Sequence, residues 1–115
     1  LKQGDHLIAS KYLFGNTHSL LKTLENFGIE ISFVDTTDLN QVTAAKRDNT
    51  LMVFAETVAN PGTQIPDLAG IGDWCEAQGL VYFVDNTLTS PYLFNPKSVK
   101  ASLIMNSLSK YFCGH

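Results

Sequence analysis

Short apolar runs alternate along this chain with segments whose apolar residues recur at helical spacing. The runs are bounded by polar or turn-forming residues and have the length that is usual for strands in globular proteins. They predict strands at His6–Ala9, Ile29–Val34, Leu51–Ala55, Leu80–Val84 and Leu103–Met105. The third run is apolar throughout, which is typical of a central parallel strand that is buried on both faces.

Helices are predicted between these strands. The first covers Thr17–Phe27, where one helical face carries the apolar residues and Gly28 supplies a C-terminal stop. That face comprises Leu20, Leu21, Leu24 and Phe27. A second helix is capped by Asp38, and Pro66-Asp67 opens a third helix, which ends at Gly79. Strands and helices in this order predict right-handed crossovers and an α/β fold, in which a mainly parallel sheet is flanked by helices.

The bulk composition narrows the class of protein. The chain has 115 residues, of which 44% are hydrophobic and 17% charged, and this fits one globular domain with its own core. No apolar run is long enough to span a membrane, and a net charge of −3 argues against a nucleic-acid-binding surface. The cysteines, Cys75 and Cys113, form neither a disulfide framework nor a metal-binding spacing. We therefore expect a cytoplasmic location and no metal site.

Polar residues directly follow the last three predicted strands. They are Glu56–Pro61, Asp85–Thr87 and Asn106–Lys110. The carboxyl ends of parallel strands lie at one edge of a sheet, where ligands bind, so these loops are expected to open on the same site. A lysine amine can condense with an aldehyde, and a carboxylate can keep a pyridine nitrogen protonated. Lys110 and Asp85 therefore together suggest pyridoxal 5'-phosphate (PLP) as the cofactor.

Both ends of the chain predict that residues 1–115 are one truncated domain of a longer polypeptide. The sequence begins without Met and ends shortly after the candidate catalytic residue Lys110. We therefore expect catalytic activity to belong to the longer protein and not to this segment alone.

Short motifs distributed over the whole chain resemble those of one enzyme family. They are Phe14-Gly15-Asn16-Thr17, Phe27-Gly28-Ile29-Glu30, Glu56-Thr57 through Asn60-Pro61, Asp85-Asn86-Thr87 with Ser90-Pro91-Tyr92-Leu93, and Ser107 through Lys110 with Gly114-His115. This set is similar to the cystathionine gamma-synthase family, the transsulfuration branch of the fold-type-I PLP enzymes. The resemblance implies that the chain is the central segment of the large, PLP-binding domain, which has an aminotransferase-like fold.

The resemblance also implies roles for individual residues at the cofactor. Lys110 would bond covalently to the cofactor aldehyde and, once displaced by the substrate amine, carry protons at Cα and Cβ. Asp85 would hold the proton on the pyridine nitrogen, and Asn60 would hydrogen-bond the phenolic oxygen. Phe14 would stack on the pyridine face. Relatives more often have tyrosine there, so the ring is kept while the phenol hydroxyl is lost.

Hydroxyl groups complete the implied cofactor site. Ser107 and Ser109 would donate hydrogen bonds to the phosphate, because hydroxyls two residues apart on an irregular segment can both reach one anion. Thr87 is counted among the cofactor-binding residues on the same resemblance. Three further parts of the site are expected outside this chain. They are a glycine-rich phosphate cup, contacts from a neighbouring subunit of a homotetramer, and an arginine for the substrate carboxylate.

The activity expected of the full-length protein is γ-replacement. A sulfur nucleophile would displace the acyl group of O-acetyl- or O-succinylhomoserine, as in a homoserine-ester sulfhydrylase or a cystathionine gamma-synthase. Elimination, as in methionine or cystathionine gamma-lyase, is the alternative within the family. A non-catalytic, receiver-like α/β signalling module is the alternative from another class. That module needs an acidic pair after its first strand, where this chain has Ser10-Lys11.

Overall fold

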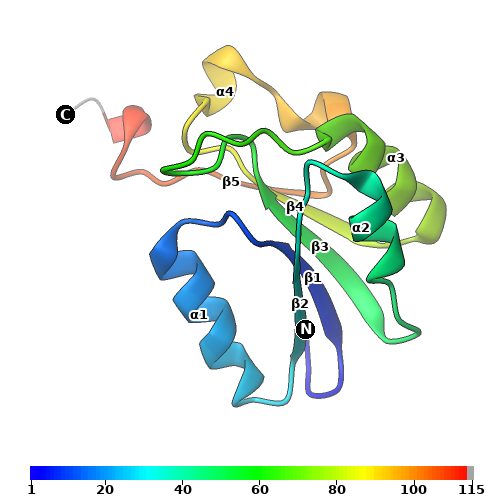
Figure 1. The fold of residues 1–115 in the computed structure, drawn as a ribbon. Coiled ribbons are helices and arrows are strands. Elements are labelled where there is room, and N and C mark those ends of the chain that lie inside the picture. Colours follow the sequence, from blue (N-terminus) through cyan, green and yellow to red (C-terminus); the bar gives the residue numbers. More distant parts are fainter. Residues whose placement is uncertain (114–115) are drawn as a thin grey trace.

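The computed structural model describes residues 1–113, which form one parallel sheet flanked by helices (Figure 1). The strands stand in the order β2-β1-β3-β4-β5, and each neighbouring pair is parallel. Their bounds are β1 His6–Ser10, β2 Glu30–Val34, β3 Thr50–Glu56, β4 Val81–Asp85 and β5 Leu103–Met105. The strand predictions are therefore confirmed, and β3, which contains the run predicted to be central, is the central strand. The motif residues Gly114 and His115 lie outside the described residues.

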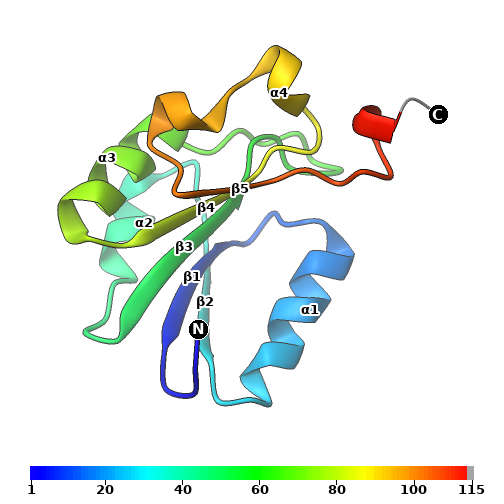
Figure 2. The same ribbon diagram turned by 180° about the vertical axis from the view of Figure 1, so that it is seen from behind.

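Helices cover both faces of the sheet. α1 lies on one face, whereas α2 and α3 lie together on the other (Figures 1 and 2). The helical elements are α1 Gly15–Glu25, α2 Leu39–Ala44, α3 Leu68–Gln78 and α4 Ser90–Leu93, with short 3-10 helices η1 Pro96–Val99 and η2 Tyr111–Cys113. Across the described residues, no helix is both long enough and apolar enough to cross a membrane.

The sheet separates two apolar cores. Successive residues of a strand point to opposite faces, so neighbouring residues of β1 belong to different cores. Leu7 lies in the core beneath α1, together with Leu21. Ile8 lies in the other core, together with Val42 of α2 and Ile71 of α3. This three-layer packing holds the strand ends, and the loops that follow them, at one edge of the sheet.

Capping residues begin two of the helices where the sequence predicts. Asp38 caps α2 by accepting a hydrogen bond from the backbone N–H of Asn40 at 3.0 Å. Asp67 caps α3 in the same way, with the N–H of Gly70 at 3.0 Å. Gly79 then ends α3 with a φ of 66°, a left-handed conformation that glycine adopts without steric cost.

The prediction for the first helix is wrong in its bounds and in part of its buried face. α1 begins at Gly15 instead of Thr17 and ends before Phe27. Leu20 and Phe27 are 60% and 68% exposed, while Leu21 is the residue that α1 buries. The reason is geometric, because Leu20 is turned by about 100° from Leu21 around the helix axis and Phe27 lies in the turn beyond the helix.

The central strand is buried on both faces only along part of its length. Leu51, predicted to be buried, is 46% exposed. The pairing register between β1 and β3 shifts at this point, since His6 pairs with Thr50 and Leu7 pairs with Met52. Leu51 is the extra residue of this irregularity, and such a residue is displaced from the regular alternation of the sheet.

Candidate active site

A cavity of about 570 Å³ lies at the carboxyl ends of the strands. Its volume is in the range that is usual for small-molecule sites. All of the residues that the sequence assigns to the cofactor lie on its wall, namely Phe14, Asn60, Asp85, Thr87, Ser107, Ser109 and Lys110. The fold therefore brings together side chains from the loops after β1, β3, β4 and β5, as the sequence predicts for a parallel sheet. Their individual roles stay predictions.

Asp85 is the last residue of β4 and is buried. Its Oδ1 accepts hydrogen bonds from the backbone N–H and the hydroxyl of Thr87, at 2.9 and 2.5 Å. The Thr87 oxygen in turn accepts the backbone N–H of Ser107 at 2.8 Å. Both bonds to the carboxylate use Oδ1, so Oδ2 is the oxygen that can receive a ligand's N–H. The same network fixes the loop after β5 against the loop after β4.

The segment after β5 brings an amine beside two hydroxyls. The Oγ atoms of Ser107 and Ser109 are 2.8 Å apart, so both can reach one anion. A turn closes when the backbone N–H of Lys110 donates to the carbonyl of Ser107 at 3.3 Å. The Lys110 side chain lines the same cavity and is otherwise exposed. This arrangement places a nucleophilic amine next to an anion-binding pair of hydroxyls.

Asn60 approaches the cavity on a loop that is held by its own backbone. The N–H of Ala59 donates to the carbonyl of Gln64, and the N–H of Thr63 donates to the carbonyl of Ala59, both at 2.9 Å. Asn60 itself is exposed and lines the cavity. Its amide is therefore free to bind a polar atom of a ligand.

Asn86, which follows Asp85 in the sequence, is not among the residues that line the cavity. It is fully buried, its Nδ2 donates to the carbonyl of Phe94 at 2.9 Å, and its Oδ1 accepts the Thr89 hydroxyl at 2.6 Å. These bonds fix the chain between β4 and α4. Asn86 therefore supports the loop that carries Asp85 and Thr87, and it does not line the site.

Glu56 also lines the cavity, and the sequence assigned no role to it. It ends β3, it is only 7% exposed, and it lies opposite Asp85 in the pairing of β3 with β4. Its Oε1 accepts the backbone N–H of Phe14 at 2.9 Å. Burial raises the pKa of the Glu56 carboxyl, the hydrogen bond from Phe14 opposes this effect, and the charge of Asp85 adds to it. The signal in the sequence was its position, directly after an apolar strand, which it shares with Asp85.

The sheet order alone does not decide between the enzyme and the signalling module. The order β2-β1-β3-β4-β5 is that of flavodoxin-like folds, which include receiver domains. The side chains at the strand ends are more informative, because β1 ends at Ser10 and is followed by Lys11, not by the acidic pair of a receiver. No group of three or more potential metal ligands occurs within the described part of the chain.

Comparison with known proteins decides the family. A family model for the Cys/Met metabolism PLP-dependent enzymes matches residues 1–115. The chain belongs to this family. Among curated relatives, it is 39% identical over 117 residues to L-methionine gamma-lyase from Fusobacterium nucleatum subsp. polymorphum, covering 100% of this chain and 30% of that protein. The chain thus spans about a third of the length of such relatives.

Solved structures agree in fold and sequence. Cystathionine gamma-lyase from Lactobacillus plantarum superimposes with a TM-score of 0.97 at 35% identity, covering 100% of this chain and 30% of that one. A putative O-acetylhomoserine (thiol)-lyase from Campylobacter jejuni gives a TM-score of 0.92 at 34% identity, covering 96% and 28%. That structure contains an N'-pyridoxyl-lysine-5'-monophosphate. The predicted fold, a parallel α/β segment of the fold-type-I large domain, is confirmed, and PLP is the cofactor of this family.

The residues around the cavity suit this cofactor. A pyridine nitrogen needs a carboxylate oxygen, and Asp85 has one that Thr87 does not occupy. An aldehyde needs an amine within the same cavity, and Lys110 provides it. A phosphate needs several donors, and the paired hydroxyls of Ser107 and Ser109 supply two of them. The donor set of this chain therefore fits PLP.

Proposed function

We propose that the protein containing this chain uses PLP, bonded to Lys110, to exchange the γ-substituent of an amino acid. The acyl group of a homoserine ester would be displaced by a sulfur nucleophile, which makes the protein a sulfhydrylase or a cystathionine gamma-synthase. The observation that carries this proposal is the meeting of Lys110, Asp85 and the hydroxyl pair at one cavity, in a chain of the transsulfuration family.

The pyridine end of the site would be governed by Asp85. Bound PLP supplies an electron sink for the substrate's Cα, and this capacity depends on a protonated ring nitrogen. Oδ2 of Asp85 would accept that proton's hydrogen bond, while Thr87 holds Oδ1 and so fixes the direction of the carboxylate. We infer that Asp85 is held in this orientation before any ligand arrives.

The other proposed contacts are those that the family resemblance implies for residues on the cavity wall. Lys110 would take and return protons at Cα and Cβ of the substrate. Phe14 would stack on the ring, and Asn60 would bind the phenolic oxygen. Ser107 and Ser109 would donate to the phosphate, and Thr87 would contact the cofactor from the wall beside Asp85 (their positions on one cavity wall support these assignments).

Elimination is the second candidate, and a particular comparison favours it. The relative from Fusobacterium nucleatum, 39% identical to this chain, is an L-methionine gamma-lyase. Replacement and elimination share three steps. These are the bonding of the substrate amine to the cofactor, the loss of protons at Cα and Cβ, and the loss of the γ-substituent. They differ in the last step, in which either a sulfur nucleophile adds or water releases a 2-oxo acid and ammonia.

Product analysis separates the two candidates. The intact protein, supplied with PLP, is incubated with O-acetyl- or O-succinylhomoserine, each with sulfide or with cysteine, and separately with methionine alone. Replacement predicts homocysteine or cystathionine and no 2-oxo acid while the nucleophile is present. Elimination predicts 2-oxobutyrate from methionine without any added nucleophile. Turnover of none of these substrates would contradict the proposal.

The assembly and the location are also proposals. We infer a cytoplasmic homotetramer in which a neighbouring subunit completes the phosphate site, as the family resemblance implies. Light scattering of the purified intact protein tests the assembly, and a mass of four subunits is expected.

A further inference from the structure

Glu56 is a buried carboxyl group for which the proposed reaction has no use. It is only 7% exposed, and its Oε1 accepts the backbone N–H of Phe14 at 2.9 Å. Its other oxygen, Oε2, is buried without a hydrogen-bond partner among the described residues. Buried carboxyl groups are costly unless they are paired, so their presence at a site calls for a specific reason.

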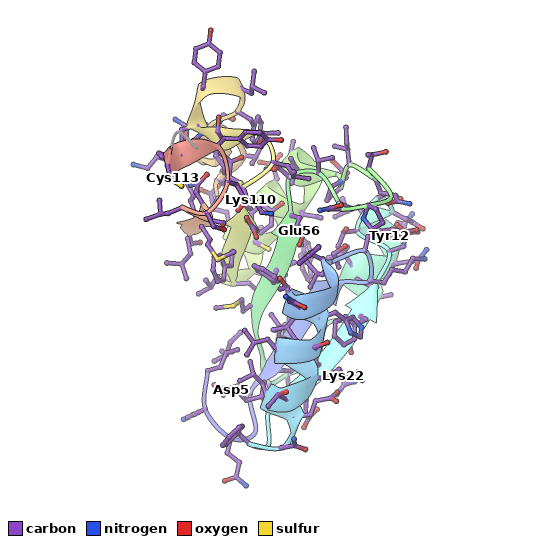
Figure 3. All side chains as sticks on the ribbon, turned by 90° about the vertical axis from the view of Figure 1, so that its left-hand side faces the viewer. Asp5, Tyr12, Lys22, Glu56, Lys110 and Cys113 are labelled. Carbon is purple, nitrogen blue, oxygen red and sulfur yellow. The ribbon has the colours of Figure 1, made fainter. Side chains whose placement is uncertain are left out.

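The hydrogen bond of Glu56 joins two distant parts of the cavity wall. It crosses 42 positions of the sequence, from the end of β3 to the residue that precedes α1. Figure 3 shows Glu56 at the end of its strand, between the N-terminal end of α1 and the segment that carries Lys110.

The rest of the chain covers Phe14 only in part. Phe14 is 44% exposed, so the apolar core does not immobilise its ring. α1 has no side-chain hydrogen bond from its own N-cap residue. The bond from the backbone of Phe14 to Glu56 is therefore the polar contact that fixes this turn relative to the central strand.

We propose that Glu56 is a positioning residue, which holds the backbone of Phe14 so that the Phe14 ring faces the cavity. The part of this inference that concerns PLP rests on the proposed function, whereas the anchoring of Phe14 does not. A glutamine at this position keeps an oxygen that can accept the N–H of Phe14, and an alanine does not. The two substitutions therefore separate the hydrogen bond from the charge.

The test uses the intact protein with Glu56→Gln, Glu56→Ala and the matched control Glu30→Ala. Glu30 is an exposed glutamate at the start of β2, paired with Arg47. The first readout is amide hydrogen exchange at Phe14 in the protein freed of cofactor. The second is the dissociation constant for PLP, measured by fluorescence titration in the wild-type background and in a Phe14→Ala background.

The proposal predicts a selective pattern. Glu56→Ala speeds exchange at Phe14 by about tenfold or more and weakens PLP binding by about tenfold, as expected for the loss of one hydrogen bond. Glu56→Gln stays within about threefold of wild type in both readouts, and Glu30→Ala changes neither. In the Phe14→Ala background, Glu56→Ala weakens PLP binding by less than about twofold, because the ring that it positions is gone.

Three results would overturn the proposal. The first is an unprotected Phe14 amide in the wild-type protein. This measurement does not depend on whether any variant folds. The second is equal exchange at Phe14 in Glu56→Ala and Glu30→Ala. The third is equal loss of PLP affinity with and without the Phe14 ring. A protein that binds no PLP would instead refute the proposed function, while the exchange data would still decide whether Glu56 anchors Phe14.

Discussion

Replacing Asp85 with asparagine should abolish most catalysis while leaving the fold intact. An asparagine can present its amide oxygen to the N–H and hydroxyl of Thr87, in place of Oδ1, so the local network survives. The NH₂ group then occupies the place of Oδ2. It is a donor only, and it cannot accept a hydrogen bond from a protonated pyridine nitrogen.

The magnitude follows from the basicity of that nitrogen. Each unit by which its pKa falls corresponds to about 1.4 kcal/mol. A fall of about three units, roughly 4 kcal/mol, would slow any step that depends on the protonated ring by about a thousandfold. We therefore expect kcat/KM of the Asp85→Asn variant to be about a thousandth of the wild-type value or lower.

The assay is steady-state kinetics on the intact protein, with the substrate that the product analysis identifies. The control is Asp73→Asn, the same chemical change at an exposed aspartate of α3 that pairs with Lys100. Thermal unfolding should show both variants within about 0.5 kcal/mol of wild type, except for any stabilisation by bound cofactor. An Asp85→Asn enzyme within tenfold of wild-type kcat/KM would refute the assignment of Asp85 to the pyridine nitrogen.

Three further predictions concern stability, measured as the free energy of unfolding. A Cβ at Gly72 would lie 1.9 Å from the carbonyl oxygen of Val99, so Gly72→Ala should destabilise the fold by about 2–3 kcal/mol. Gly15→Ala is the control, because open space surrounds Gly15, and equal destabilisation by the two substitutions would contradict this packing. Burial lowers the pKa of His6 from 6.5, so the free energy of unfolding should fall as the pH drops below about 6.5. His6→Asn should reduce this dependence on pH, and an unchanged dependence would contradict the role of His6. Burial raises the pKa of Glu56 from 4.5, so the free energy of unfolding should fall as the pH rises from below 4.5 through the raised pKa. Glu56→Gln should therefore be more stable than wild type at neutral pH but not at pH 4, and equal stability of the two proteins at neutral pH would contradict this.

Local sequence patterns predicted most of the fold. The apolar runs became strands, and Asp38 and Asp67 became helix caps, because each of these features depends on residues that are close in the chain. The exposed positions of Leu20 and Leu51 could not be predicted in this way. They depend on how α1 is rotated against the sheet and on a register shift between β1 and β3.

In the candidate site, too, features that depend on local sequence were predictable, and a contact between distant residues was not. Asp85 and Lys110 stand in motifs, and the parallel topology brings them to one edge, so their convergence was predictable. Glu56 was not, because its contact with Phe14 spans 42 positions of the sequence and uses the backbone of its partner. Every residue except proline has a backbone N–H, so the identity of Phe14 gives no indication of this bond.

Identifying the lysine that carries the cofactor tests the role of Lys110 most directly. The intact protein is incubated with PLP and reduced with borohydride, which fixes the cofactor covalently to the amine that holds it, and the labelled peptide is then mapped by mass spectrometry. If Lys110 holds the cofactor, the wild-type protein carries one stoichiometric label, on Lys110, and a Lys110→Ala variant carries none. A stoichiometric label on another lysine, such as Lys97 or Lys100, or the same labelling after Lys110 is replaced, would contradict it.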